Sequence, residues 1–198
     1  MNLIDRAKNI LITPKTEWEV IKNENLSVAE MFTGYAVILA AIPAIAGFIG
    51  RSLIGITVPF VGTTIKIPIG TGLVWAVLYY LLTLAGVYVI ALIMDALAPS
   101  FGSSKNLVAS LKVAVFSSTA AWLAGIFTIF PLLSILSIVG LYSLYLLYLG
   151  MKTVKEPPQD KLVGYFVVLL ILTIVVYFVV GAIVGAIALS GYAVTGYM

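Results

Sequence analysis

The chain has 198 residues, of which 62% are hydrophobic and only 10% are charged. A soluble domain carries roughly 25% charged residues because its surface faces water, so this composition excludes an ordinary soluble protein. The sequence contains no cysteine and no histidine, which excludes disulfides, thiol nucleophiles, Cys/His zinc sites and His-based proton relays.

Residues 1–26 are predicted to form an amphipathic N-terminal segment. Apolar residues recur at helical spacing over 3–11, with charged residues on the other side, which is typical of a short amphipathic helix. Thr13-Pro14 favours the start of a second short helix that carries Trp18 on one face. Such a segment either lies along the headgroup layer or packs on the helix bundle, and the sequence leaves both interpretations open.

Long stretches without a charged residue dominate the rest of the chain. About 20 apolar residues are needed to cross about 30 Å of hydrocarbon, and the stretches provide five crossings. The predicted fold is therefore an all-α integral membrane protein, a five-helix transmembrane bundle over 27–190 followed by a short external tail at 191–198. The five helices are expected at about 27–53, 70–97, 106–127, 131–151 and 162–189.

Local signals mark the first helix and the loop after it. Ser27 and Glu30 match the capping box that opens a helix. Pro43 lies inside this helix, where a kink is expected rather than a break. Residues 54–68 contain β-branched residues, two prolines and Gly62, which predicts an extended external loop with a small hairpin, or less favourably a re-entrant segment.

The distribution of basic residues predicts the orientation. With the N-terminus in the cytoplasm, nine basic residues fall on the inside and only two, Arg51 and Lys66, on the outside. Basic residues concentrate in cytoplasmic segments, so the N-terminus is predicted inside and the C-terminus outside. The nine internal residues are Arg6, Lys8, Lys15, Lys22, Lys105, Lys112, Lys152, Lys155 and Lys161. This topology also explains the net charge of +3, so no nucleic-acid partner is inferred.

Four segments carry a likeness to a known family: LITPKTEW at 11–18, ALAPSFG at 96–102, FSSTAAWLAGIF at 116–127 and GLYSLYLLYLG at 140–150. In this order they resemble the bacterial branch of the Yip family, the Ypt/Rab-interacting multispanning membrane proteins that carry the Yip domain. The resemblance implies a five-helix membrane domain in the bacterial inner membrane. Eukaryotic members are associated with Rab GTPases, a function that is not transferred to this chain.

The sequence departs from the family pattern at two places. Ala120 or Ala121 stands where a proline is expected after the Ser-Ser-Thr run, which weakens the expectation of a kink in the third helix. Ser103-Ser104 replaces part of a glycine-rich turn. The loop residues that carry the family motif are Pro99, Phe101 and Gly102.

Asp95 is the acidic residue closest to a membrane interior. An ionisable group inside a span is a functional candidate because burying it at the bilayer centre costs about 2.5–3.5 kcal/mol. Asp95 is expected near the cytoplasmic end of the second helix, however, where an ion pair with Lys105 or Lys112 is the simpler role. Arg51 lies at the opposite interface and is interpreted as a snorkelling anchor.

Hydroxyl groups in the third and fourth helices form the remaining polar candidates, Ser117, Ser118, Thr119, Tyr145 and Tyr148. They either line a cavity or form hydrogen bonds between helices, which contribute about 0.6 kcal/mol each, and the second role is favoured. Small residues such as Gly181 and Gly185 permit close helix packing, which internal contacts of the bundle are expected to use; dimerisation through the fifth helix stays open.

No catalytic constellation, cofactor motif or metal-ligand cluster appears in the sequence, so an enzyme is not expected. The leading hypothesis is a non-enzymatic membrane protein that acts through protein partners or membrane and lipid organisation, with the lipid bilayer, membrane proteins or a second copy of itself as partners. The alternative is a small-solute transporter or channel through a polar cavity between the second, third and fourth helices.

Overall fold

A computed structural model describes the backbone of residues 2–57 and 64–195, and the side chains of residues 2–55 and 64–186. Five helical segments in the described part are long and apolar enough to cross a membrane. They are Val28–Ile54, Ile69–Phe101, Leu107–Ile129, Pro131–Lys155 and Gln159–Ala186, called spans 1 to 5. The predicted fold class, an all-α integral membrane bundle, is confirmed.

Several spans combine α-helix with tighter or wider helical turns. The α-helices are α1 (Leu3–Ile12), α2 (Pro14–Asn23), α3 (Val28–Met31), α4 (Val37–Phe48), α5 (Ile69–Leu97), α6 (Leu107–Ser117), α7 (Thr119–Ala124), α8 (Tyr142–Gly150) and α9 (Gln159–Thr195). The 3₁₀ segments are η3 (Ala98–Phe101), η4 (Gly125–Ile129) and η5 (Pro131–Leu141), and the π segments are η1 (Phe32–Ala36), η2 (Ile49–Ile54) and η6 (Met151–Lys155). Helix α9 thus begins before its predicted start at 162 and continues beyond 189.

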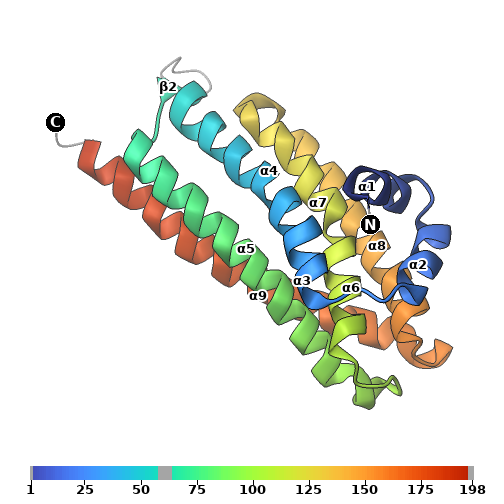
Figure 1. Cartoon of the computed structure of the whole chain (residues 1–198). Helices are drawn as coiled ribbons and strands as arrows, with labels where there is room; N and C mark the ends of the chain where they lie inside the picture. Colours follow the sequence, from blue (N-terminus) through green and yellow to red (C-terminus); the bar gives the residue numbers. More distant parts are fainter. Residues whose placement is uncertain (1, 58–63, 196–198) are drawn as a thin grey trace.

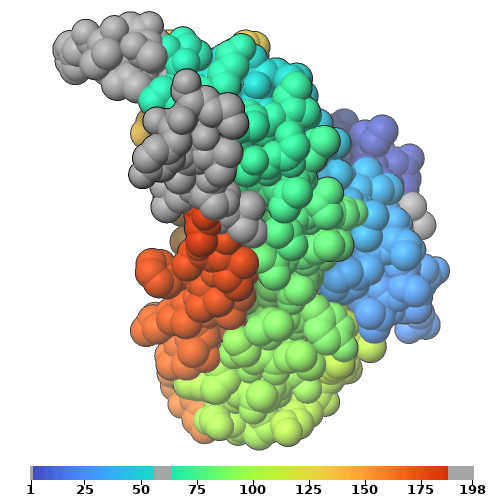
Figure 2. All heavy atoms as spheres, turned by 90° about the vertical axis from the view of Figure 1, so that its left-hand side faces the viewer, coloured from blue at the N-terminus to red at the C-terminus, as the bar shows by residue number. Residues whose placement is uncertain are grey.

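The long helices α5 and α9 run side by side along the bundle, α4 and α6 pack against α5, and α7 packs against α4 (Figure 1). Figure 2 shows α5 in green beside α9 in orange and red on one face of the molecule. Gly181 and Gly185 of α9 do not serve this packing: no described atom comes within 4 Å of a Cβ added at either glycine. The expectation that internal packing explains these glycines is therefore wrong.

The start of span 1 follows the sequence prediction. The Ser27 hydroxyl accepts from the Glu30 N–H at 3.2 Å, and the Glu30 carboxylate accepts from the Ser27 N–H at 2.9 Å, which completes the capping box. Helix α4 continues through Pro43 without a break. After span 1, the strands β1 (Ile56–Thr57) and β2 (Thr64–Ile65) pair antiparallel, and the predicted Gly62 turn lies outside the described residues.

The N-terminal helices α1 and α2 pack on the bundle beside α7 and α8 (Figure 1). Ile10, Trp18 and Ile21 are fully buried, and the Trp18 indole lies so close to Gly150 that a Cβ added there would come within 2.7 Å of it. This is the packed arrangement that the amphipathic pattern left open. Within the segment, buried Arg6 of α1 contacts the carboxylates of Glu17 in α2 and Glu24 directly after it, and these ion pairs hold the two helices together.

A further ion pair, between Lys22 and Glu156, ties α2 to the segment between α8 and α9. The hydrogen bond from the Lys22 ammonium to the Glu156 carboxylate raises the pKa of Lys22 above its ordinary value of 10.5.

Candidate functional site

Asp95 lies at the end of α5, where it organises the turn into α6. Its carboxylate accepts from the Asn106 N–H at 2.6 Å and from the Ser110 hydroxyl at 3.4 Å. The Lys155 ammonium lies 3.5 Å away, and only 1% of that lysine side chain is exposed. Asp95 is thus a junction between spans 2, 3 and 4.

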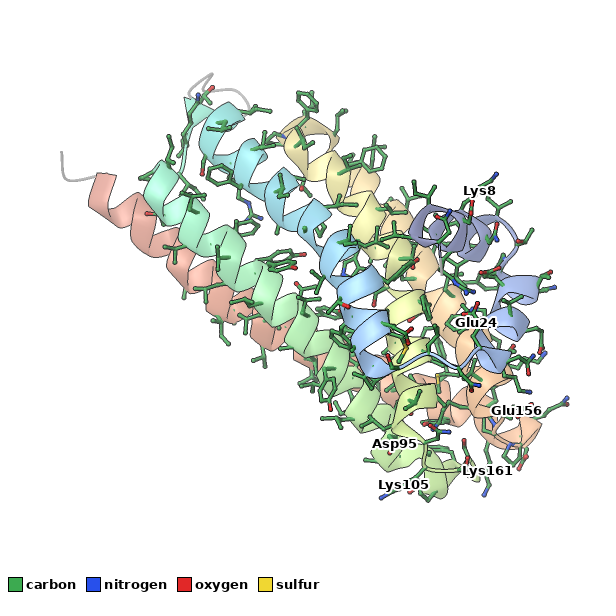
Figure 3. The ribbon with its side chains drawn as sticks, in the orientation of Figure 1. Lys8, Glu24, Asp95, Lys105, Glu156 and Lys161 are labelled. Carbon is green, nitrogen blue, oxygen red and sulfur yellow. The ribbon has the colours of Figure 1, made fainter. Side chains whose placement is uncertain are left out.

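The predicted partners of Asp95 are wrong. Lys105 is exposed, and the Lys112 ammonium instead donates to the backbone carbonyls of Glu24 at 2.6 Å and Lys22 at 3.1 Å. The six charged residues labelled in Figure 3, among them Asp95 and Lys105, all lie toward the end of the bundle opposite the β1–β2 pair.

The family-motif loop caps α5 and connects it to α9. Gly102 adopts a left-handed conformation with φ 72°, which glycine reaches without steric cost, and its N–H donates to the Pro99 carbonyl at 3.1 Å. The Phe101 ring stacks on Tyr165 of α9 with ring centroids 4.9 Å apart. Tyr165 in turn donates to the Met94 carbonyl of α5. Pro99 itself is exposed. Because of the Gly102 turn and the Phe101–Tyr165 stack, the motif ends α5 and holds it against α9.

The Ser-Ser-Thr run interrupts span 3, although no proline follows it. Ser117 and Ser118 donate to the Ala114 carbonyl at 3.2 and 2.8 Å, and Thr119 donates to the Phe116 carbonyl at 2.7 Å. Hydroxyls that bond back to carbonyls of the preceding turn bend helices, and α6 ends here while α7 begins one residue later. The α-helix is therefore interrupted at Ser118, although the sequence weakened the expectation of a kink in this span.

Thr119 also joins span 3 to span 1. The Tyr35 hydroxyl lies 2.8 Å from the Thr119 hydroxyl, and both residues are fully buried. Since the single hydroxyl proton of Thr119 goes to the Phe116 carbonyl, Tyr35 is the donor in this pair.

The two tyrosines predicted to accompany the hydroxyl run lie elsewhere. Tyr145 is 42% exposed and tilts against Tyr142 at 5.4 Å between ring centroids. Tyr148 packs edge-on against Phe166 at the same centroid distance. Neither residue lines the crevices described next, so they do not form a common site with Ser117 and Ser118.

Two crevices open on either side of span 4. The first, called the Arg51 crevice, has a volume of about 770 Å³ and lies between spans 1 to 4. The second, called the Thr173 crevice, has a volume of about 570 Å³ and lies between spans 2 to 5. Both reach Ala121, Gly140 and Leu141. A Cβ added at Gly140 would lie 3.2 Å from the Cα of Ala121, so a contact of small residues separates the crevices.

A cation stacked on aromatic rings marks the first crevice. The Arg51 guanidinium lies 4.1 Å from the centre of the Trp75 ring, and Trp75 stacks on Tyr79 at 5.1 Å with the rings nearly parallel. A Cβ added at Gly47 would come within 2.6 Å of the Trp75 indole, so glycine there admits the indole between spans 1 and 2. The interpretation of Arg51 as a snorkelling anchor overlooked this stack. No local sequence signal pairs Arg51 with Trp75, because the two residues belong to different spans.

The second crevice is apolar with hydroxyls in its wall. Ser117, Ser118, Ser143 and Thr173 line it among aliphatic and aromatic side chains. The Thr173 hydroxyl oxygen is buried and, within the described part of the chain, has no hydrogen-bond partner. Of the predicted hydroxyl residues, Ser117 and Ser118 therefore border a crevice, whereas Thr119 does not.

Comparison with known proteins decides the family. The sequence matches the Yip1 domain over residues 8–183. The chain belongs to the Yip1 domain family. It is similar to "Inner membrane protein YohC" of Escherichia coli strain K12, with 34% identity over 113 residues that make up 57% of each chain. The protein of the same name from E. coli O6:H1 gives the same figures.

The matched segment thus spans about 57% of the length of these curated relatives. No solved structure matches the chain. The family resemblance inferred from the four sequence segments is confirmed by the Yip1 domain match.

Proposed function

We propose that this Yip1 domain protein is a non-enzymatic membrane protein that acts on the organisation of the surrounding lipid. The observation that carries the proposal is the pair of crevices on either side of span 4, bordered by apolar side chains that face outward. Ile135 and Ile138 at the Arg51 crevice are 73% and 63% exposed, and Phe178 at the Thr173 crevice is 76% exposed. In a bilayer such surfaces face hydrocarbon, so lipid chains are the molecules that fill the crevices.

The chemistry of the walls supports binding more than catalysis. Arg51 is the charged residue among the side chains that line the two crevices, and it is accompanied by hydroxyls and aromatic rings. An arginine stays protonated and orients anions, but it does not exchange protons in acid–base chemistry. Asp95, the ionisable candidate from the sequence, is engaged at the far junction with Lys155.

Solute transport is the second candidate, favoured by the way the two crevices meet. Gly140 and Ala121, which are in contact with each other, line both crevices together with Leu141, and glycine and alanine offer little side-chain bulk to obstruct a path. The path would run between spans 2, 3 and 4, with span 1 or span 5 completing the wall of each crevice.

The proposal includes a location in the bacterial inner membrane with the N-terminus in the cytoplasm. The E. coli relatives are named as inner membrane proteins, which supports the location. The separation of basic residues supports the orientation, since Arg51 and Lys66 lie near the β1–β2 end of the bundle and Lys105 and Lys161 lie near the other end (Figure 3). A C-terminal reporter that is active only in the cytoplasm should stay inactive. Activity of that reporter would reverse the orientation.

Reconstitution into vesicles separates the candidate functions. The first measurement uses spin-labelled phospholipid and determines the fraction of lipid whose motion is restricted. If the protein organises lipid, this fraction should be larger than in vesicles that contain the same mass of helix as a single-helix peptide. Solute transport predicts saturable flux for a member of a small-solute panel. Restricted lipid without saturable flux supports the leading proposal. Flux without restricted lipid supports the second, and the absence of both would leave protein partners as the route of action.

A further inference from the structure

We propose that the Arg51 crevice is a binding site for a phosphodiester lipid, whose phosphate contacts Arg51 and whose acyl chain extends toward Gly140. The inference rests on the proposed lipid function and names the ligand class of that site. It is carried by the position of one cation at the end of an otherwise uncharged crevice.

The charged end is built to present arginine to an anion. The central carbon of the Arg51 guanidinium lies 4.1 Å from the centre of the Trp75 ring, a cation–π contact that holds the group at the crevice wall. Arginine carries five N–H donors in a planar fork that matches two phosphate oxygens, so a bidentate contact is compatible with other hydrogen bonds of the same side chain. The packing of Trp75 on Gly47 and Tyr79 holds the platform in place.

The crevice is polarised along the bundle in the way that a lipid is. Pro43, Gly47 and Arg51 follow one another at four-residue spacing on one face of span 1, which covers about 12 Å at 1.5 Å per residue. Arg51 lies near the end of the span, and the deeper lining includes Ile138 and Leu141. A free phosphate ion contacts only the charged part of the crevice, whereas a phospholipid contacts both the charged and the apolar part.

Hydroxyls in the lining of the crevice add acceptors for a headgroup. Thr128, Ser134 and Ser137 line the crevice, and each donates its proton to a backbone carbonyl three residues earlier, at 2.6–2.7 Å. Their lone pairs therefore remain available to donors such as the hydroxyls of a glycerol headgroup. Acceptors in the same crevice as a cation complement a phosphodiester that carries a hydroxylated headgroup.

The first test measures binding to the full chain, purified in a phosphate-free detergent and stripped of lipid. Native mass spectrometry would compare phosphatidylglycerol with diacylglycerol that has the same acyl chains, with inorganic phosphate as competitor. We expect phosphatidylglycerol to bind at least about tenfold more tightly, because a charge-assisted hydrogen bond is worth about that factor. Arg51→Gln should remove the preference. Lys66→Gln, a matched change of the other basic residue at this end, should leave it intact.

The second test places the lipid. A photoreactive side chain at Ile138 should capture phospholipid more efficiently than one at Val77, which is exposed on α5 outside the crevice lining. Ile138→Trp, which fills the apolar part from an exposed position, should weaken phosphatidylglycerol binding by about tenfold while Arg51 is unchanged.

Several outcomes would overturn the inference. Equal binding of the two lipids, or an unaltered preference in Arg51→Gln, would refute phosphate recognition, and lipid capture at Ile138 would then still support the lipid function. Complete displacement of the lipid by inorganic phosphate would identify a free anion as the ligand. Capture at Ile138 no greater than at Val77 would refute both the site and the function, as would capture of a protein there.

Discussion

Replacing Asp95 by asparagine separates a structural junction from a functional carboxylate. The substitution keeps an oxygen that can accept from the Asn106 N–H, now 2.6 Å away, but it removes the negative charge beside Lys155. The Lys155 ammonium keeps the Ser104 carbonyl at 2.9 Å and the Asn106 carbonyl at 3.5 Å as acceptors. The variant therefore leaves a buried cation hydrogen-bonded but without a counter-charge.

The expected loss follows from the burial of the pair. Removing one partner of a fully buried ion pair costs about 3–5 kcal/mol because the other charge is left uncompensated. The Asp95 side chain is 19% exposed, and Lys155 keeps its carbonyl partners, so a smaller loss of about 2–3 kcal/mol in the free energy of unfolding is expected. Lys155→Met removes the stranded charge, so the double variant should be more stable than the sum of the single losses by about 1–2 kcal/mol.

Unfolding in mixed micelles of mild detergent and SDS, followed by far-ultraviolet circular dichroism, measures these free energies. Glu19→Gln is the matched control, because Glu19 is an exposed carboxylate on α2, and it should change stability by less than about 0.5 kcal/mol. A loss in Asp95→Asn no larger than in the control, together with no coupling to Lys155, would refute the junction role. Asp95 would then return as a candidate for function.

Five further substitutions test the packing. Trp18→Ala should cost about 3–5 kcal/mol and expose α1 and α2 to limited proteolysis; unchanged resistance would contradict the docking. Thr119→Val should lower the free energy of unfolding by about 1–3 kcal/mol, because it leaves the buried Tyr35 hydroxyl without a hydrogen-bond acceptor. Tyr35→Phe should lower it by only about 1 kcal/mol. A larger loss in Tyr35→Phe than in Thr119→Val, measured in SDS titrations, would make Thr119 the donor in the Tyr35–Thr119 hydrogen bond. Gly125→Ala forces a Cβ to within 2.9 Å of backbone and should cost about 1–3 kcal/mol, whereas Gly181→Ala, with open space, should not destabilise; equal effects would contradict the contact.

The sequence was sufficient for features that depend on local composition. Five crossings follow from apolar length alone, because hydrocarbon excludes charges over a fixed thickness. The capping box at Ser27 and Glu30 was readable because both partners lie within one helical turn. The interruption at Ser118 uses equally local chemistry, but hydroxyls in a helix bend it only when they bond back to the preceding turn, which residue type alone does not determine.

Contacts between segments far apart in the chain could not be predicted from the sequence. Asp95 meets Lys155 rather than the nearer lysines, because η6 brings its end to the end of α5 in three dimensions. The Arg51 stack on Trp75 likewise joins two spans whose relative rotation is set by the packing of side chains, in part through Gly47. Helical periodicity gives the face on which a residue lies but not which neighbour covers that face.

The unusual geometry of span 4 and the crevices have a common origin. Segment η5 is 11 residues of 3₁₀-helix, although runs longer than about 3–4 residues are uncommon because their hydrogen bonds are poorly aligned. None of its residues is buried, although it contacts η4 and α7, and it forms walls of both crevices. At about 2.0 Å per residue it rises faster than an α-helix, and it is correspondingly thinner, which leaves space on both sides. A lipid in the Arg51 crevice would supply the contacts that η5 lacks, and so the binding site and the stability of this segment are expected to depend on each other.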